Sequence, residues 1–278
     1  MAELLKIENL TLGFGEKVIF RDINVSEENG RFVALAGSNG RGKSTLLKTL
    51  AGLGSIYNKK LINNPDSLQH SEEGSILYKG KKIEQYTKKE FSSLVSFVFP
   101  NGRRTNNLSV KDMLSIYCYY RTNWIGAPGE DEEKRISKAL EQVGLSGFES
   151  RNSASLSDGE YQRVTIAGAL VQDSEIILLD EPTAFLDIAN KFMITHLLKE
   201  IAHASGKLII FSTHDLQLAL DMCDRLWLMT ESGFYSGEPE TLMNNGTMDK
   251  MFNVPGLIFD RTIKSFTYDG NFKNNKRV

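Results

Sequence analysis

Residues 37–45 read GSNGRGKST. Their spacing fits the phosphate-loop pattern G-x-x-x-x-G-K-[ST], with Gly37, Gly42, Lys43 and Ser44 in the four fixed places. The pattern suits a triphosphate because backbone N–H groups converge on the anion, and glycines permit the tight turn and the close approach of the main chain. We expect Lys43 to reach the β- and γ-phosphates and the Ser44 hydroxyl to ligate Mg²⁺.

The flanking residues supply the strand–loop–helix context that such a loop needs. The run 31–37 (RFVALAG) is apolar and strand-like, and Leu46, Leu47 and Leu50 follow at helical spacing. The N-terminus of that helix would direct its positive dipole end at the anion. A glycine-rich turn without a ligand is the weaker alternative. We expect nucleotide contacts from Gly37, Ser38, Asn39, Gly40, Gly42, Lys43, Ser44 and Thr45.

Two adjacent acids end an apolar run in the second half of the chain. Residues 176–181 read IILLDE, as expected for a buried parallel strand. Asp180, at the strand's end, would hold the Mg²⁺ shell beside Ser44, and Glu181 would act as general base on the water that attacks the γ-phosphate. The alternative is a strand that ends in two solvated acids.

A serine and a glycine mark the start of a helix before that strand. Residues 156–160 read LSDGE, and YQRVTIAGALV follows with apolar residues at helical spacing. Taken alone, the pentapeptide would be an ordinary helix start, with Ser157 as N-cap and Glu160 completing a capping box. Helix N-termini also bind phosphate, so both interpretations stay open at this point.

The order of these motifs resembles that of the nucleotide-binding subunit of ABC transporters, over nearly the whole chain. LSDGE stands where that family carries its LSGGQ signature, and PTAFLD, which ends in Asp187, resembles the family's D-loop. His214 in STHD stands at the switch-histidine position, and Phe14 stands where the family places an aromatic side chain that stacks on adenine. The family's usual glutamine is replaced by Asn101 in SFVFPNGRR, which keeps the amide but shortens its reach by about 1.5 Å.

The resemblance implies a head-to-tail homodimer in which each ATP lies between the phosphate loop of one subunit and the signature of the other. Ser157 and Gly159 would contact the γ-phosphate bound by Lys43 of the second copy, and His214 would hold the γ-phosphate and the attacking water. Asn101 would face Mg²⁺ or its water, although Asn-Gly is also a plain turn dipeptide. The implied catalytic residues are Glu181, His214, Lys43 and Asn101; further nucleotide contacts are Phe14, Ser157, Gly159 and Asp187; the metal ligands are Ser44, Asn101 and Asp180.

The signature departs from its commonest form, because Asp158 and Glu160 stand where Gly and Gln are usual. The added negative charge would repel a phosphate. We therefore expect these side chains to turn away or to meet a basic partner such as Arg163.

Composition is that of an intracellular enzyme without a membrane span. The chain has 278 residues, 41% of them hydrophobic and 24% charged, and its net charge of −2 gives no hint of a nucleic-acid partner. Cys118 and Cys223 follow no metal-ligand pattern and fit a reducing compartment. No stretch approaches the roughly 20 apolar residues that span a bilayer, and the first ten residues carry no basic leader.

The predicted fold is α/β, a P-loop NTPase core with a mainly parallel sheet, an N-terminal antiparallel β-subdomain and an inserted α-helical signature subdomain. One ABC-type ATPase domain would span residues 1–278. Within it we expect a catalytic core with the β-subdomain (1–100 and 172–240), the helical subdomain (101–171) and a short C-terminal extension (241–278). Predicted elements are strands near 4–10, 18–25, 207–212 and 225–229, helices near 109–120 and 130–145, a strand pair near 257–270, and a surface loop at 54–74.

The wording LSDGEYQR, DEPTAFLDIANK and THDLQLALDMCDRLWLM most resembles the ATPases of importers for iron chelates (siderophores), haem and vitamin B12. This resemblance implies a homodimer of ATPase subunits at the cytoplasmic face of the inner cell membrane, bound peripherally to integral-membrane permease subunits and served indirectly by an extracytoplasmic binding protein. One alternative is a soluble, non-transport ABC ATPase of the iron–sulfur-assembly or repair type. The other is an ATP-dependent scaffold without turnover.

Overall fold

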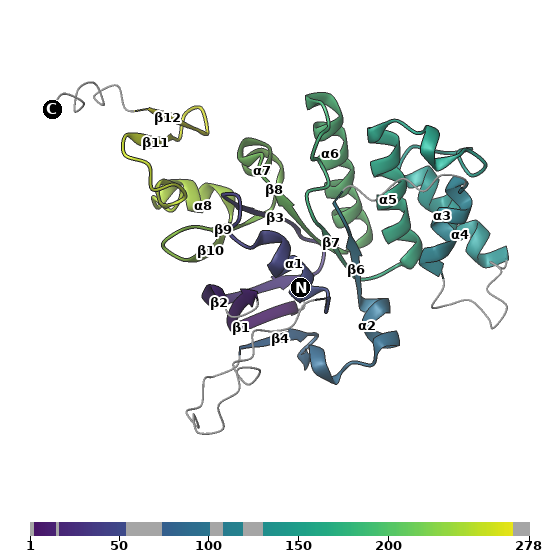
Figure 1. The fold of residues 1–278 in the computed structure, drawn as a ribbon, viewed down its shortest axis with the longest axis horizontal. Coiled ribbons are helices and arrows are strands. Elements are labelled where there is room, and N and C mark those ends of the chain that lie inside the picture. Colours follow the sequence, from purple (N-terminus) through teal and green to yellow (C-terminus); the bar gives the residue numbers. More distant parts are fainter. Residues whose placement is uncertain (1–2, 15–16, 54–73, 101–107, 119–129, 269–278) are drawn as a thin grey trace.

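A six-stranded sheet runs through the centre of the molecule (Figure 1). The computed structural model describes residues 3–14, 17–53, 74–100, 108–118 and 130–268. The strand order of this sheet is β10-β9-β3-β8-β7-β6. The strands are β3 (Phe32–Gly37), β6 (Val95–Val98), β7 (Ile176–Leu179), β8 (Leu208–Thr213), β9 (Arg225–Met229) and β10 (Phe234–Gly237).

The predicted parallel sheet is confirmed. β3 pairs in parallel with β8 and β9, β7 pairs in parallel with β6 and β8, and only the edge strand β10 is antiparallel to its neighbour. Every residue of β3, β7 and β8 is buried, which explains their continuous apolar runs. Parallel pairing also brings the carboxyl ends of five strands to one edge, where the polar motifs of the sequence follow.

A second, antiparallel sheet of four strands has the order β2-β1-β4-β5. The two predicted N-terminal strands are present but longer, because register shifts in their ladder let the pairing continue beyond residue 10. α1 (Lys43–Leu50) contacts β1 of this sheet and β3 and β8 of the central one, with Leu46, Leu47 and Leu50 fully buried. The strands are β1 (Glu3–Phe14), β2 (Lys17–Glu28), β4 (Ser75–Tyr78) and β5 (Lys81–Lys82).

Helices α3, α4 and α5 form a group beside the sheet, beyond the long helix α6 (Figure 1). Ser109 caps α3 at the predicted start of this helix, accepting a hydrogen bond from Asp112 N. The helix predicted over 109–120 is shorter, because its α-helical part ends at Ser115 and tightens into a 3-10 turn, Ile116–Cys118. The helices are α2 (Lys88–Leu94), α3 (Val110–Ser115), α4 (Glu130–Gln142), α5 (Asp158–Gln172), α6 (Ile188–Ser205), α7 (Leu216–Met222) and α8 (Pro239–Asn244).

The predicted C-terminal strand pair is a hairpin of β11 (Leu257–Asp260) and β12 (Ser265–Tyr268). The surface loop expected at 54–74 lies, except for its last residue, outside the described residues, and the proposed domain boundaries stay a prediction. No helix in the described part of the chain has the length and apolar character that crossing a membrane requires.

One buried carboxylate links the two sheets. Glu27, at the end of β2, is 2% exposed and accepts hydrogen bonds from Trp227 Nε1 at 2.7 Å and Arg225 Nε at 3.5 Å, both on β9. Burial raises the pKa of Glu27, while the bonds from Trp227 and Arg225 oppose that rise. The carboxylate therefore fixes the antiparallel sheet, which packs over α1, against the central sheet.

We expect Glu27→Ala to lower the free energy of unfolding by about 2–4 kcal/mol, because it leaves an indole N–H and part of a guanidinium without their buried acceptor. Urea denaturation measures the change. The matched control is Glu28→Ala, which removes a partly exposed carboxylate from the next position and is expected to change stability by about 0.5 kcal/mol or less. Equal losses in the two variants would contradict the linking role.

Candidate nucleotide-binding site

The carboxyl ends of the parallel strands bring the motifs of distant sequence segments together. The phosphate loop follows β3, Asp180 and Glu181 follow β7, and His214 follows β8. β8 lies between β3 and β7, so its last residues stand between the phosphate loop and the acids. Ligands of open α/β sheets bind at this edge.

Glycine is required in the phosphate loop for two reasons: positive φ angles and the close approach of a neighbouring strand. Gly40 and Gly42 have φ of 74° and 94°, in the left-handed region that favours glycine. A Cβ on Gly37 would lie 2.6 Å from the carbonyl oxygen of Met229 on β9, so the first glycine of the motif permits close strand packing.

The Lys43 side chain folds back over the loop. Its Nζ donates hydrogen bonds to Gly37 O at 2.8 Å and Ser38 O at 3.3 Å, and it lies 3.4 Å from His214 Nδ1. Burial lowers the pKa of Lys43, and the negative charges of Glu181 and Asp180 oppose that shift. The loop thus holds a partly desolvated ammonium at the position where the sequence predicts phosphate binding.

A buried serine that the sequence analysis did not select organises the two acids. Ser212, the fifth residue of β8, donates to Asp180 Oδ1 at 2.7 Å and accepts from Glu181 N at 2.8 Å. Ser44 Oγ donates to the same Asp180 oxygen at 2.9 Å. A hydroxyl in the otherwise apolar run before Thr213 was the available signal for Ser212.

Glu181 and His214 form a close pair. Glu181 has a φ of 50°, a left-handed conformation that is uncommon outside glycine, and its Oε1 lies 2.6 Å from His214 Nε2. The Asp180 side chain is buried and the Glu181 side chain partly exposed, as expected for neighbours that point opposite ways. Lys43, His214 and Glu181 therefore make a continuous polar chain along the edge of the sheet.

An ion pair that the sequence analysis did not predict connects the phosphate loop to the segment after β9. Arg41, within the phosphate loop, forms an ion pair with Glu231 after β9, and its Nε lies 3.4 Å from Ser38 Oγ. The two residues are far apart in sequence, so their meeting depends on β9 lying beside β3.

The signature begins α5 with the predicted capping box. Ser157 accepts from Glu160 N, and Glu160 accepts from Ser157 N at 2.8 Å. Hydrogen bonds from Ser157 to the carboxylate lower the pKa of Glu160, with a smaller contribution from Arg151, whose Nη1 lies 3.1 Å from the carboxylate. The basic partner of Glu160 is therefore Arg151 and not the suggested Arg163, because the capping box directs the side chain back toward residue 151.

The start of α5, in the signature, lies against the start of α6, which follows the D-loop in the same chain. Asp187 caps α6, accepting from Asn190 N at 2.8 Å and Asn190 Nδ2 at 2.9 Å, and the backbone bond from Asn190 is the main cause of the lowered pKa of Asp187. A Cβ on Gly159 would lie 2.8 Å from Asn190 Oδ1. Gly159 thus permits the first turns of α5 and α6 to touch.

Two candidate residues cannot be placed in this geometry. Asn101 falls in residues 101–107, outside the described residues. Phe14 ends β1, where it pairs with Lys17, and its side chain is also outside the described part.

The Ser44 hydroxyl and the Asp180 carboxylate are the kind of oxygen donors that Mg²⁺ prefers. Within the described ranges, no group of three or more His, Cys, Asp or Glu side chains could hold a metal ion by itself. The donor set fits Mg²⁺, which commonly uses one or two protein ligands and completes its shell with phosphate oxygens and water.

The comparison with known protein families agrees with this strand-end geometry. The sequence pattern described as "ABC transporter" matches residues 20–184. The chain belongs to the ABC transporter family. It is one of the family's ATPases. The predicted resemblance to the nucleotide-binding subunits of ABC transporters is confirmed.

Three relatives illustrate the similarity. The chain is 32% identical over 246 residues to the achromobactin transport ATP-binding protein of Dickeya dadantii, over 88% of this chain and 86% of that one. It is 32% identical over 215 residues to the iron(3+)-hydroxamate import ATP-binding protein of Bacillus subtilis, over 77% and 74% of the two chains. A solved structure of a proposed metal-chelate type ABC transporter, in an inward-facing conformation, superposes with a TM-score of 0.73 at 26% identity, over 95% of both chains.

Ser212→Ala should lower the free energy of unfolding by about 1–3 kcal/mol, because it leaves the Glu181 amide without its acceptor and removes one of the two hydrogen bonds to Asp180 Oδ1. Denaturant unfolding of the purified protein tests this. Ser205→Ala is the control, since its hydroxyl bonds only the Ile201 carbonyl one turn back at the exposed end of α6. If Ser212→Ala were as stable as Ser205→Ala, Ser212 would not organise the acids.

Proposed function

We propose that this chain is the ATP-hydrolysing subunit of a transporter that imports an iron chelate, haem or cobalamin through a separate membrane permease. The observation that carries the proposal is the polar chain Lys43–His214–Glu181 beside the Ser44–Asp180 pair, with distances of 2.6–3.4 Å between neighbouring polar atoms. These residues supply a cation for phosphate, a general base and a metal-binding pair at one edge of the sheet.

The proposed mechanism assigns one task to each side chain. Lys43 exchanges its bonds to loop carbonyls for the β- and γ-phosphate oxygens. Glu181 accepts a proton from the water that attacks the γ-phosphorus, and His214 holds the water and the γ-phosphate in line. Ser44, Asp180 and Asn101 would hold Mg²⁺, which would neutralise part of the phosphate charge.

The remaining contacts of the nucleotide follow from the same proposal. Phe14 stacks on adenine, and Asp187 contacts the nucleotide from the D-loop. The backbone of Gly37, Gly40 and Gly42 surrounds the phosphates. Loop side chains complete the site at Ser38, Asn39 and Thr45.

The proposed homodimer is supported by exposed apolar residues beside the D-loop. Phe185 and Ile188, on either side of Asp187, are 84% and 87% exposed, and Phe192 follows one turn later on α6, also exposed. Large apolar side chains gathered on one surface mark interaction sites. A second copy placed head to tail would cover this surface and bring its Ser157 and Gly159 to the γ-phosphate.

ATP-driven closure would be coupled to the permease through the segment that contains Asn101. The helical subdomain, 101–171, which follows the catalytic core segment 1–100, would take part in the same coupling. The ATPase would bind peripherally at the cytoplasmic face of the membrane, and an extracytoplasmic binding protein would act through the permease alone. The cargo class is supported by the relatives named for achromobactin and iron(3+)-hydroxamate.

Glu181→Gln is expected to bind ATP normally and to stall before hydrolysis, since the amide keeps the shape of the side chain but cannot accept the proton. Lys43→Ala should lose ATP binding or turnover. Radiolabelled ATP retention and phosphate release separate the two outcomes. Normal hydrolysis by Glu181→Gln would contradict the general-base assignment.

The transport role is tested by what purifies with tagged Glu181→Gln protein from detergent-solubilised membranes in ATP and Mg²⁺. Mass spectrometry should detect a multi-span permease, in about equal amount to the ATPase. Only soluble partners, with none of the protein in the membrane fraction, would contradict import and favour the non-transport ATPase.

Exchange of both Phe185 and Ile188 for serine should weaken ATP-driven dimerisation of the Glu181→Gln protein by about ten-fold or more, because two buried anchors are lost. Light scattering across a concentration series measures it. The control is Ile263→Ser, in the turn of the C-terminal hairpin, which removes an exposed apolar side chain from another surface. Unchanged dimerisation would place the interface on another surface.

A further inference from the structure

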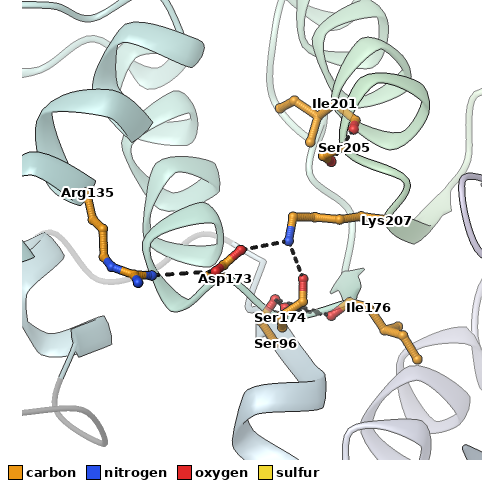
Figure 2. Close-up of polar contacts among 8 residues, drawn as sticks. All are labelled: Ser96, Arg135, Asp173, Ser174, Ile176, Ile201, Ser205 and Lys207. Carbon is orange, nitrogen blue, oxygen red and sulfur yellow. Dashed lines mark hydrogen bonds and ion pairs between the residues drawn. The ribbon is translucent and has the colours of Figure 1, made fainter.

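The C-terminal end of the signature helix α5 is fixed to the central sheet by a group of polar contacts (Figure 2). Lys207, directly before β8, donates to Ser174 O at 2.6 Å and pairs with Asp173 Oδ1 at 3.1 Å. Asp173 Oδ2 lies 3.5 Å from Arg135 Nη1 of α4. One carboxylate therefore joins the end of α5, the neighbouring helix α4 and the start of the strand that carries Ser212.

Further hydrogen bonds fix the C-terminal end of α5. Ser174 is fully buried, and its Oγ lies 2.9 Å from Ser96 Oγ on β6. Gln172 Nε2 donates to Ser92 O at 2.6 Å. Asp173 itself has a φ of 57°, a left-handed conformation that aspartate tolerates better than most residues. Helix α5 thus ends in a tight, fully bonded turn that leads into β7.

Lys207 and Arg135, the cations that contact Asp173 from the described part of the chain, are not equivalent. The Lys207 side chain is 14% exposed, whereas the side chains of Arg135 and Asp173 are 44% and 53% exposed. An ion pair between exposed groups contributes little, but an ammonium removed from water depends on its partners. Lys207 therefore carries the contact between α5 and the sheet, and Arg135 adds little to it.

The other end of α5 has less complete packing. A partly open cavity of about 290 Å³ lies between α6 and the helices α4 and α5, lined by Arg163, Asn190 and Met193 among others. Arg163 Nε, at this cavity, is buried and makes no hydrogen bond to any described residue. Nearer the signature, Gly159 lies against the Asn190 side chain of α6.

Helix length turns a small change at one end into a large displacement at the other. α5 has 15 residues, so its axis is about 22 Å long at 1.5 Å per residue. A tilt of about 5° at its C-terminal end would displace Ser157 and Gly159 by about 2 Å. A misplacement of about 1 Å can lower a rate on the order of a hundred-fold.

We propose that Lys207 and Asp173 are positioning residues for ATP hydrolysis, acting through the direction of α5 to place the signature. The inference rests on the proposed function, because the signature matters for hydrolysis only if it contacts the nucleotide of a second copy. Neither residue touches the nucleotide. Their effect is therefore on the closed, reacting assembly and not on the binding of ATP to the phosphate loop.

Lys207→Met should lower kcat for ATP about ten-fold or more and change KM less than two-fold, because Lys43 and its loop are untouched. Arg135→Met, which removes the exposed partner of the same carboxylate, should change kcat less than two-fold. Lys207→Arg should restore most of the rate. A parallel rise in KM, equal losses in the two methionine variants, or no rescue by arginine would overturn the proposal.

Asp173→Asn keeps the size of the side chain and its tolerance of the left-handed backbone while removing the charge. It should lower kcat in the same direction as Lys207→Met but by no more, because Lys207→Met also removes the hydrogen bond to Ser174 O. The double variant should be no slower than Lys207→Met alone, since that substitution already removes the shared ion pair. Additive losses would show that the two residues act separately and would overturn the shared role.

A distance measurement separates this inference from the proposed function. Nitroxide labels are attached at Lys138→Cys on α4 and Glu200→Cys on α6, after the buried Cys118 and Cys223 have been replaced by alanine. Double electron–electron resonance then measures the distance between α4 and α6 in the nucleotide-free chain. Lys207→Met should broaden or shift the distance distribution, and Arg135→Met should not. An unchanged distribution overturns the anchor even if the chain hydrolyses ATP; a changed one supports it even if the chain does not.

Discussion

The buried carboxylate of Asp180 is the point at which the catalytic segments are tied together. Its Oδ1 accepts from Ser44 at the start of α1 and from Ser212 on β8, and Ser212 in turn accepts from the Glu181 amide. The phosphate loop, the acidic strand end and the strand before His214 are thus connected through three hydrogen bonds of 2.7–2.9 Å. In a low-dielectric setting such a network is stable only when every member is bonded. Because the parallel order β3-β8-β7 brings Ser44, Ser212 and Asp180 together, the arrangement of the site depends on this strand order.

The segment from Ser157 to Glu181 connects that network to the signature without a break. It runs along α5, turns at Asp173 and Ser174, forms β7 and ends at the two acids. Lys207 ties the turn to the start of β8, whose opposite end carries Ser212. The two ends of β8 therefore serve different parts of the same enzyme: one holds the acids, and the other holds the helix that presents the signature. Under the proposed role of Lys207, this arrangement is the physical path by which the direction of α5 would affect the rate of ATP hydrolysis.

Features that depend on residue type and local spacing could be predicted from the sequence. The phosphate loop, the buried acidic strand and the Ser157 capping box are short-range patterns, and the structure has them where they were expected. Contacts between distant segments could not be predicted in the same way. Ser212 with Asp180, Arg41 with Glu231 and Lys207 with Asp173 meet only because of strand order and backbone direction. Arg163 was named as an example of a basic partner for the acids of the signature, and Glu160 meets Arg151 instead, because the capping box turns its side chain back toward residue 151.

In the proposed homodimer, each ATP site is shared between two copies of the chain, with the phosphate loop of one facing the signature of the other. Disulfide formation between Arg41→Cys and Ser157→Cys, introduced together in the Glu181→Gln protein, tests it most directly, because the native cysteines among the described residues are buried. The account predicts a covalent dimer, seen by non-reducing electrophoresis, only when ATP and Mg²⁺ are present. No cross-link with ATP, or the same yield without it, would contradict the shared site.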